Sequence, residues 1–358
     1  MPRVVITRRR LLASIIFVVS VVAFLYFVLP KLVGLQNTWN RIEHGNAWWF
    51  AVGAVLEVLS FGGYIVLFRA VFVRPPSRID WRESYQITMA GLAATRLFAS
   101  AGAGGIALTG WALRRSGLDA RVAACRLVAF MVLLYAVFMI SLVVVGLGLY
   151  VGIIPNHGAP FAITVVPAIF GAFVIALFLS ATLLPVDFEK LVGRWAGRDH
   201  WYARLARKLA ALPATTGSGV RTAIGLVRNR DPMLLGAIAW WGFDICVLWA
   251  CFHAFGASPP KGVIVMSYFV GMFGNTLPLP GGIGGVDGGM IGAFAAFGVH
   301  VQVAIVAVLA YRAFAFWLPT LPGAVAYLQL RRTVHRWEET RASAPDASGA
   351  GTEAPSYT

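Results

Sequence analysis

Five ionisable side chains stand in parts of the sequence that are otherwise apolar for about the length of a membrane crossing. They are Glu57, Arg96, Asp244, Asp287 and Arg312. A charge at bilayer depth is costly, so such residues usually face a water-filled cavity, a substrate or ion path, or one another. The acids can therefore pair with the arginines, accept a cationic headgroup or take up protons.

A sixth residue, Arg126, lies closer to the expected inner surface, and we group it with Arg312. Arginine holds a phosphate bidentately, which lysine does not, so these two side chains are candidate phosphate ligands. The competing interpretation is structural: the charges form salt bridges between helices and bind nothing else.

Glycine and proline interrupt two of the same apolar stretches. The segment NTLPLPGGIGGVDGGM, residues 275–290, combines prolines with paired glycines, and residues 101–105 hold a second glycine cluster. Irregular backbone is tolerated at bilayer depth only where protein or a water-filled cavity surrounds it. A helix that restarts after such a break, here near Ile283, presents free N–H groups and a positive dipole end to an anion. Close packing between helices, which also uses small residues, is the alternative.

The candidate substrate-binding residues are therefore the residues of the two breaks together with the buried charges. They are Gly102, Gly104, Gly105, Pro280, Gly281, Gly282, Gly284, Gly285, Asp287, Arg312, Arg126, Arg96, Glu57 and Asp244. The sequence has no Ser/His/Asp set, metal-ligand cluster, CxxC pair or phosphate-binding loop. We therefore expect no enzyme, no metal site and no cofactor.

Membrane-spanning helices have to position these residues. Of the 358 residues, 59% are hydrophobic and 13% charged, and the mean hydropathy is +0.75; a soluble domain has about a quarter charged residues. A transmembrane helix needs about 20 apolar residues. The sequence thus predicts an all-α polytopic membrane protein with about six full crossings, at 11–29, 47–68, 120–152, 161–184, 233–255 and 300–328.

Two further segments, 83–116 and 262–297, do not fit a simple crossing. Each has a helical half, a glycine-rich break and a second short half. The charges that flank the first segment place both its ends inside, and the crossings on either side of the second segment place both its ends outside. We therefore predict two re-entrant broken-helix hairpins that enter from opposite faces of the membrane.

The residues around the two hairpins recur at a nearly constant distance along the chain. Glu57 and Asp244 are 187 residues apart, and Arg126 and Arg312 are 186 apart. Such spacing is typical of inverted-topology repeats, whose substrate site lies near the midplane between discontinuous helices. The sequence therefore favours an inverted repeat.

The positions of the basic residues explain the net charge of +15. With both termini inside, three of the 30 Lys and Arg residues fall outside and two within membrane segments. This asymmetry follows the positive-inside rule, so we expect a multi-pass protein of the cell membrane with both termini in the cytoplasm. The same explanation excludes nucleic acid as a partner and leaves anionic lipid headgroups as an additional one.

The sequence divides into three regions. Residues 1–10 are a basic cytoplasmic N-terminus, residues 11–332 the transmembrane domain, and residues 333–358 a largely disordered cytoplasmic tail. Within the domain, residues 186–231 carry Arg and Lys among Leu, Trp and Tyr at helical spacing, which predicts an amphipathic helix on the inner leaflet. A plain linker that only sets the topology is the alternative for this segment.

The stretch LPLPGGIGGVDGG resembles a known family. This is the flippase-like integral membrane family of the UPF0104 type, which includes the transmembrane region of lysylphosphatidylglycerol synthases. Its proline–glycine–glycine motif and the following acid fall on Pro280, Gly281, Gly282 and Asp287. Its later arginine falls on Arg312 in YRAFAFWLP, and a glycine-rich segment before a basic loop matches AGAGGIALTGWALRRSG.

The resemblance covers most of residues 10–332. The chain departs from the family pattern in the first hairpin, where GGIALTG lacks the acid of many relatives, and at Asp287, where relatives have Glu. We expect no soluble aminoacyl-transfer domain, such as the bifunctional relatives have, after the last crossing. The resemblance therefore implies no lysyl transfer to lipid.

From the residues and the resemblance together we expect a lipid flippase or transporter. It would move a phospholipid or lipid-linked headgroup between leaflets through a polar cavity at the midplane, and its partners would be membrane lipids that carry phosphate. The alternative is a non-transporting membrane partner that presents lipid to a separate glycosyl- or aminoacyltransferase. A membrane-embedded enzyme that acts on the lipid is the weakest hypothesis, because the sequence shows no nucleophile with a base and no metal set.

Overall fold

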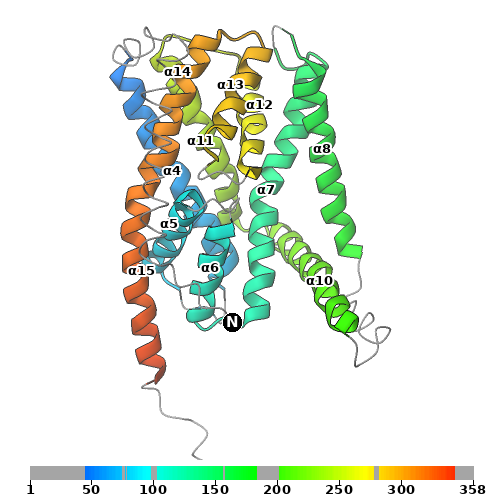
Figure 1. Cartoon of the computed structure of the whole chain (residues 1–358), viewed down its shortest axis with the longest axis vertical. Helices are drawn as coiled ribbons and strands as arrows, with labels where there is room; N and C mark the ends of the chain where they lie inside the picture. Colours follow the sequence, from blue (N-terminus) through cyan, green and yellow to red (C-terminus); the bar gives the residue numbers. More distant parts are fainter. Residues whose placement is uncertain are drawn as a thin grey trace, which may run out of the picture.

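A computed structural model of the chain describes residues 45–74, 77, 79–97, 103–155, 158–183, 201–277 and 282–342. The regular secondary structure of these residues is helical, with no strand. The elements are α4 (Ala47–Phe72), α5 (Trp81–Leu97), α6 (Ala103–Arg115), α7 (Ala120–Tyr150), α8 (Phe161–Ser180), η2 (Ala181–Leu183), α10 (Trp201–Arg228), η3 (Pro232–Leu234), α11 (Leu235–Ala254), α12 (Lys261–Met272), η4 (Phe273–Thr276), α13 (Gly285–Ala296), α14 (Val301–Arg312), η6 (Ala313–Trp317) and α15 (Leu318–Ala342). Figure 1 shows them as one bundle, with α10 lying obliquely at one end.

Five helices in the described part of the chain are long and apolar enough to cross a membrane. They lie at Ala47–Phe72, Ala120–Tyr150, Phe161–Leu183, Pro232–Ala254 and Val301–Thr340. Large apolar side chains face outward from them; Val144 and Phe173 are 61% and 63% exposed. Such surface is unfavourable in water and ordinary against lipid. The chain is therefore an all-α polytopic membrane protein, as predicted, and the expected crossing at 11–29 lies outside the described residues.

The two segments that the sequence predicts to turn back are helical hairpins. α5 packs against α6, and α12 packs against α13; in Figure 1 the two pairs enter the bundle from opposite ends. Glycines let the paired helices touch. A Cβ on Gly105 would lie 2.6 Å from the Gly91 carbonyl oxygen, and one on Gly274 would lie 2.3 Å from the backbone nitrogen of Val286.

Side-chain caps set where the helices around the first hairpin begin. At the start of α5, Asp80 Oδ1 accepts a hydrogen bond from the Glu83 N–H at 2.7 Å, and Glu83 Oε2 accepts one from the Asp80 N–H at 3.0 Å. This capping box satisfies donors that a helix end leaves unpaired. Asp119 similarly accepts from the N–H groups of Arg121 and Val122 at the start of α7.

Helices α4 and α11 cross antiparallel in the middle of the bundle. The Asn46 N–H, just before α4, donates to the Ala254 carbonyl at the end of α11 at 2.9 Å. At the crossing, a Cβ on Gly236 would lie 2.4 Å from the Gly63 carbonyl oxygen, so only glycine fits there. Small residues at such a contact let two helix backbones approach closely.

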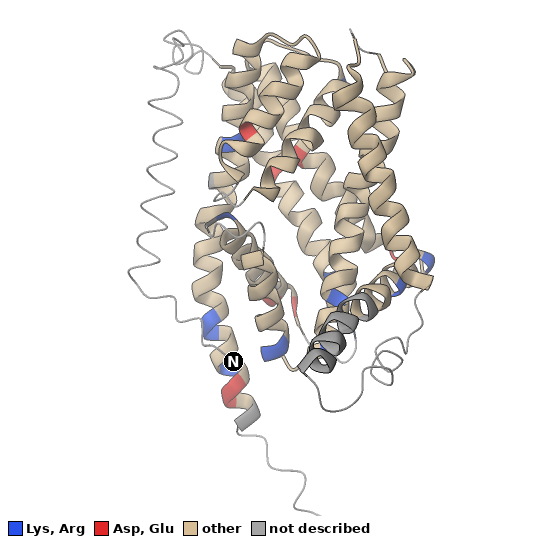
Figure 2. Ribbon diagram, turned by 45° about the vertical axis from the view of Figure 1, so that its right-hand side comes forward, with Lys and Arg blue, Asp and Glu red and all other residues tan. Residues whose placement is uncertain are grey.

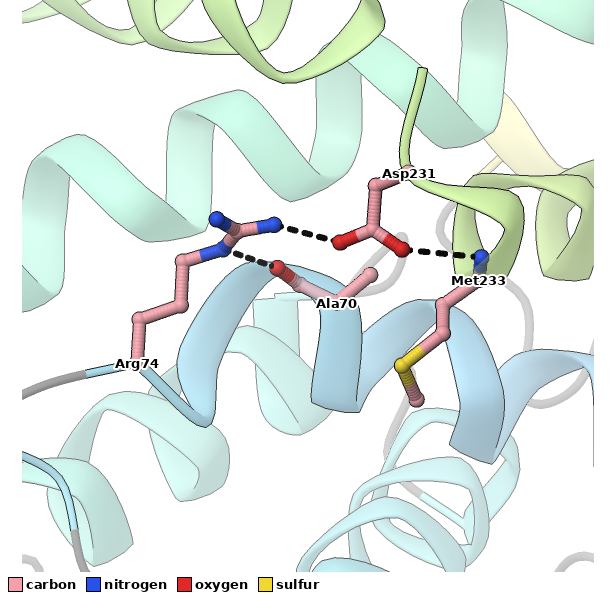
Figure 3. A network of polar contacts seen from close by, with 4 residues as sticks. All are labelled: Ala70, Arg74, Asp231 and Met233. Atoms are coloured by element: carbon pink, nitrogen blue, oxygen red, sulfur yellow. Dashed lines mark hydrogen bonds and ion pairs between the residues drawn. The ribbon is translucent and has the colours of Figure 1, made fainter. Parts of the chain in front are cut away.

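The other end of this helix pair is held by a polar network, which Figure 3 shows. Arg74 Nη2 lies 2.5 Å from Asp231 Oδ2, and Arg74 Nε donates to the Ala70 carbonyl at 2.7 Å. Asp231 Oδ1 accepts from the Met233 N–H at 3.0 Å. Arg74 thus binds a carbonyl in the last turn of α4, while Asp231 caps η3, which leads into α11.

A long helix, a hairpin and another long helix follow one another twice in the described chain. The first run is α4, α5–α6 and α7; the second is α11, α12–α13 and α14, which continues into α15. The second run is upside down relative to the first, because α4 and α11 are antiparallel and the hairpins enter from opposite ends (Figure 1). The two runs also interlock, since α5 packs against α15 and α12 packs against α7.

Most lysines and arginines of the described residues gather at one end of the bundle, as Figure 2 shows. We call this the basic end; α10 and the last turns of α15 lie there (Figure 1). The second half of α10 packs on α7, where a Cβ on Gly219 would lie 2.5 Å from a methyl carbon of Val128. The expected amphipathic segment 186–231 thus contains α10, of which the side chains of 201–214 are outside the described part.

Helix α15 continues to Ala342, past the expected end of the transmembrane domain. Its last turns are held against α5: Thr333 donates to Gln86 at 2.9 Å, and Trp337 Nε1 donates to Glu83 at 3.0 Å. The polar composition of this stretch predicts a tail, but contacts with a distant helix keep its first part helical. The remainder of the expected tail lies outside the described residues.

Candidate functional site

The buried charges that the sequence singles out meet at the centre of the bundle. Arg96 lies within electrostatic range of Glu57, Asp244 and Arg312, and Arg312 forms an ion pair with Asp287. The three acids are 1%, 6% and 7% exposed, in the order Glu57, Asp244 and Asp287. Together with two tyrosines these residues form what we call the central polar cluster. Its members are Glu57 (α4), Arg96 (α5), Asp244 (α11), Tyr268 (α12), Asp287 (α13), Tyr311 and Arg312 (α14).

The ion pair of Asp287 and Arg312 stands at the break of the second hairpin. Arg312 Nε lies 2.7 Å from Asp287 Oδ1, and the side chains of Arg312 and Asp287 are 12% and 10% exposed. Asp287 Oδ2 accepts from the Gly284 N–H at 2.8 Å. The start of α13, expected to bind the anion of a substrate, is thus capped by a carboxylate of the same helix.

The helix geometry changes directly after Arg312. Residues Ala313–Trp317 form a π-helical turn between α14 and α15. Such turns are rare in proteins, and those that occur are frequently found at functional sites. The turn therefore lies next to the two residues, Tyr311 and Arg312, that α14 contributes to the central polar cluster.

Glu57 and Asp244 form a pair of buried carboxyl groups where α4 meets α11. Their side chains lie within hydrogen-bonding range of each other. Asp244 Oδ2 accepts from the hydroxyl groups of Tyr268 and Tyr311, the latter at 3.1 Å. In contrast, Glu57 Oε2 and Asp244 Oδ1 are buried with no hydrogen-bond partner among the described residues.

Arg96 stands in the last turn of α5, where the first hairpin breaks off. The residue as a whole is half-buried, but its Nη1 atom is buried and has no hydrogen-bond acceptor in the described part of the protein. A buried charged donor without an acceptor is unfavourable. Arg96 is therefore the cation in the central polar cluster that is best placed to receive an acceptor from outside.

The described glycines of the two breaks serve the turns and contacts of the hairpins. Gly282 and Gly284 have φ angles of +66° and +83°, which glycine adopts without steric cost. A Cβ on Gly285 would meet the Gly274 carbonyl oxygen at 2.9 Å, so this position, like Gly105, is a helix contact. Gly104 lies in the first turn of α6, and Gly102, Pro280 and Gly281 lie outside the described residues.

The structure places Arg126 outside the central polar cluster. Its Nη1 donates to the carbonyl of Phe72 at 3.0 Å and to that of Arg74 at 3.4 Å. Arg126 thus binds the carbonyl groups that the C-terminal end of α4 leaves unpaired. Arg126 and Arg312 thus bind different parts of the protein, and their role as phosphate ligands stays a prediction.

Tyr268 and Tyr311 belong to the central polar cluster although the sequence does not single them out. Both are fully buried in apolar helices. A buried tyrosine hydroxyl usually needs a hydrogen-bond partner. That requirement is the signal in the sequence that points to them, since Tyr311 directly precedes a buried arginine.

The chemistry of the cluster is that of ion pairs, hydrogen bonds and protons. Within the described ranges, no three His, Cys, Asp or Glu side chains are arranged to hold a metal ion. The cysteines Cys125, Cys246 and Cys251 are free.

An apolar groove lies beside the crossing of α4 and α11, toward the basic end. Its volume is about 510 Å³, and its walls include Leu59, Trp81, Leu235 and Phe243. The guanidinium of Arg69 lies 4.0 Å above the ring of Trp81. A predominantly apolar concave surface of this size suits a hydrocarbon chain.

The fold and the central polar cluster define a polytopic α-helical membrane protein with two broken-helix hairpins around a buried charged centre. The family model of the lysylphosphatidylglycerol synthase TM region matches residues 11–323. The chain therefore belongs to this family, as the motifs in the sequence indicate.

Two curated relatives are both described as UPF0104 membrane proteins of Methanothermobacter thermautotrophicus (strain Delta H). One is 23% identical over 330 residues, which cover 87% of this chain and 94% of the relative. The other is 33% identical over 104 residues, which cover 28% of this chain and only 30% of the relative. The similarity to the first relative thus extends over almost the whole chain at low identity, whereas the second relative matches a shorter part of the chain at higher identity.

Proposed function

We propose that this protein moves a phosphate-bearing lipid between the two leaflets of a membrane. The headgroup passes the central polar cluster while the acyl chains remain in the surrounding lipid. The observation that carries the proposal is the buried Nη1 of Arg96, which lacks an acceptor among the described residues at the break of the first hairpin. Phosphate oxygens are among the acceptors that arginine binds best.

The two runs of helices support a path with two steps. We interpret them as an inverted-topology repeat, in which discontinuous helices surround a midplane site. Arg96 at one break lacks an acceptor for Nη1, whereas Arg312 at the other break is paired with Asp287. A phosphate that passes from Arg96 to Arg312 takes the place of Asp287 as the partner of Arg312. The phosphate thus occupies first one break and then the other during transport.

The apolar groove toward the basic end supports the same proposal. It opens beside α4 and α11, the helices that carry Glu57 and Asp244. An acyl chain in this groove would bring its headgroup alongside the cluster. The family name refers to a phospholipid, which agrees with a lipid substrate.

The location we propose is the cell membrane, with the basic end in the cytoplasm. The gathering of Lys and Arg at that end (Figure 2) is the basis for the orientation. Both termini of the chain would then be cytoplasmic.

Reconstitution in liposomes tests the proposal. The full chain is incorporated into vesicles that contain fluorescent phosphatidylglycerol, and the rate at which the label reaches the outer leaflet is measured. Wild type should exceed empty vesicles, and Arg96→Gln should lower the rate about 10-fold to 100-fold, as expected for losing a charged hydrogen bond. Arg96→Lys, which keeps the charge, should lose less, and Arg332→Gln, an exposed arginine on α15, should leave the rate unchanged.

No acceleration by wild type over empty vesicles across several anionic lipids would overturn the transport function. The second candidate, presentation of lipid to a separate transferase, is favoured by the groove, which holds an acyl chain without requiring translocation. It would gain support if the inactive protein still co-purifies with a phospholipid, identified by mass spectrometry.

A further inference from the structure

The contact of Glu57 with Asp244 contains two acceptors and no donor. Both carboxyl groups are buried, at 1% and 6% exposure, and they lie within hydrogen-bonding range of each other. Glu57 Oε2 and Asp244 Oδ1 have no other partner among the described residues. An ionised carboxylate only accepts hydrogen bonds, whereas a protonated carboxyl also donates one. A single proton between the two groups therefore satisfies both oxygens, which no side chain in the described part of the protein does.

The groups around the pair agree with one proton. Arg96 of α5 faces both carboxyls. The hydroxyls of Tyr268 and Tyr311 donate to Asp244 Oδ2, so Asp244 is stabilised as the acceptor and Glu57 as the donor. Two further groups lie within electrostatic range: Cys251 of α11, which is near Glu57, and Arg312 of α14, which is near Tyr311. Farther out, Tyr135 of α7 interacts with Tyr64 of α4.

The charges of the central polar cluster balance only when the pair holds a proton. The cluster has two arginines and three acids, and Asp287 already neutralises Arg312. With one proton on the pair, the remaining negative charge matches Arg96 and the cluster is neutral. With none, the cluster carries an unbalanced negative charge at bilayer depth, which is costly.

We propose that Glu57 and Asp244 together form a proton-binding site whose proton is coupled to lipid movement. The coupling rests on the proposed transport function, whereas the binding of the proton does not. When the phosphate of a lipid binds Arg96, the guanidinium no longer balances the remaining negative charge of the carboxyl pair, and the pair takes up a second proton. When the phosphate leaves, Arg96 again balances the pair and this second proton dissociates. By reciprocity, a bound proton also strengthens phosphate binding at Arg96, so proton and lipid move in the same direction.

Infrared difference spectroscopy of the full chain in lipid nanodiscs tests the proton-binding site without any transport. At neutral pH, wild type should show the carbonyl band of a protonated carboxyl that disappears on alkalinisation. The band should be absent from Glu57→Gln and from Asp244→Asn, whose amides can donate the hydrogen bond themselves. It should persist in Glu83→Gln, a carboxyl variant at the start of α5. A missing band in wild type, or a band that survives in either pair variant, overturns the shared site.

Translocation under opposite pH gradients tests the coupling. One proton per lipid means that a gradient of about one pH unit shifts the distribution of labelled phosphatidylglycerol between leaflets about tenfold, toward the alkaline side. Glu57→Gln/Asp244→Asn, which has no carboxyl left in the pair, should show no such bias, whatever its rate of translocation. Translocation by wild type that ignores the gradient overturns the coupling and leaves the transport function standing. Absence of any translocation overturns the transport function and the coupling, while the infrared result decides the proton site by itself.

Discussion

Two of the buried acids of this protein, Asp287 and Asp244, have specific partners within a few ångströms. Arg312 is paired with Asp287, and Asp244 accepts from two tyrosine hydroxyls. Removing one partner of such a pair leaves a buried charge without compensation, which destabilises more than the intact pair stabilises. Stability and lipid binding are therefore expected to respond to the same few substitutions.

Asp287→Asn should lower the free energy of unfolding by about 3–5 kcal/mol, because the buried Arg312 loses its ion pair with Asp287. The double variant Asp287→Asn/Arg312→Gln should lose less than the sum of the two single variants, since residues in contact couple by about 0.5–3 kcal/mol. Equilibrium unfolding in detergent measures all three losses. Losses that simply add would show that the two residues do not stabilise each other.

Asp119, outside the membrane-spanning helices, gives a prediction about pH. The backbone N–H groups of Arg121 and Val122 hold the pKa of the Asp119 carboxyl below its ordinary value. Its contribution to stability is therefore present above the ordinary pKa of aspartate and lost as the pH falls through the lowered pKa. Asp119→Ala should thus be less stable than wild type at neutral pH, with a difference that shrinks in acid. Thermal unfolding at several pH values measures it, and a difference that persists in acid would contradict the assignment.

The hairpins owe their shape to backbone contacts between glycines. In the second hairpin, Gly274 of η4 faces Gly285 of α13, and Gly271 of α12 faces Gly289 of α13. These contacts bring the end of α12 and the start of α13 together, and they thereby set the position of Asp287. These glycines therefore allow the two halves of the hairpin to pack tightly.

Gly274→Ala should destabilise the protein by about 1–3 kcal/mol, as overpacking does. Its Cβ would lie only 2.2 Å from the backbone carbonyl carbon of Gly285, which cannot move without opening the hairpin. Gly288→Ala is the matched control on α13, because a Cβ there meets nothing within 4 Å; it should be neutral or stabilise by up to about 1 kcal/mol. The unfolding temperatures of the two variants, compared with wild type, measure both effects. Equal values would mean that the hairpin adapts freely to the added methyl group.

The complete bundle joins two runs of helices that are inverted relative to each other and interlocked. α4 and α11 cross at its centre, and each hairpin packs on the last long helix of the other run. The interlocking places residues from both runs in the central polar cluster. One end of the bundle is basic, and the other end has few charges (Figure 2).

The orientation of the bundle is testable by cysteine labelling in intact cells. Ser258→Cys lies in the exposed loop before α12, at the end opposite α10, and should react with a membrane-impermeant maleimide. Asn229→Cys lies exposed after α10 at the basic end and should react only after permeabilisation. The wild-type protein is the control for its native cysteines. The reverse pattern would place the basic end outside the cell.

The membrane class, the family and the two broken segments could be predicted from the sequence because they depend on single residues and short windows. A run of apolar residues spans a bilayer whatever surrounds it, and paired glycines and prolines end a helix locally. The buried charges were also identifiable, since a charge in an apolar stretch is conspicuous by itself. The helical structure of the last turns of α15 could not be predicted, because contacts with α5 rather than their own composition keep them helical.

Only the tertiary structure decided which charge meets which. Arg126 and Arg312 occupy equivalent places in the sequence, yet one binds the end of α4 and the other pairs with Asp287. The contact of Glu57 with Asp244 depends on an antiparallel crossing of two helices far apart in the chain. Hydrogen bonds and ion pairs act over a few ångströms, and the crossing of distant helices, which local patterns do not encode, sets those distances.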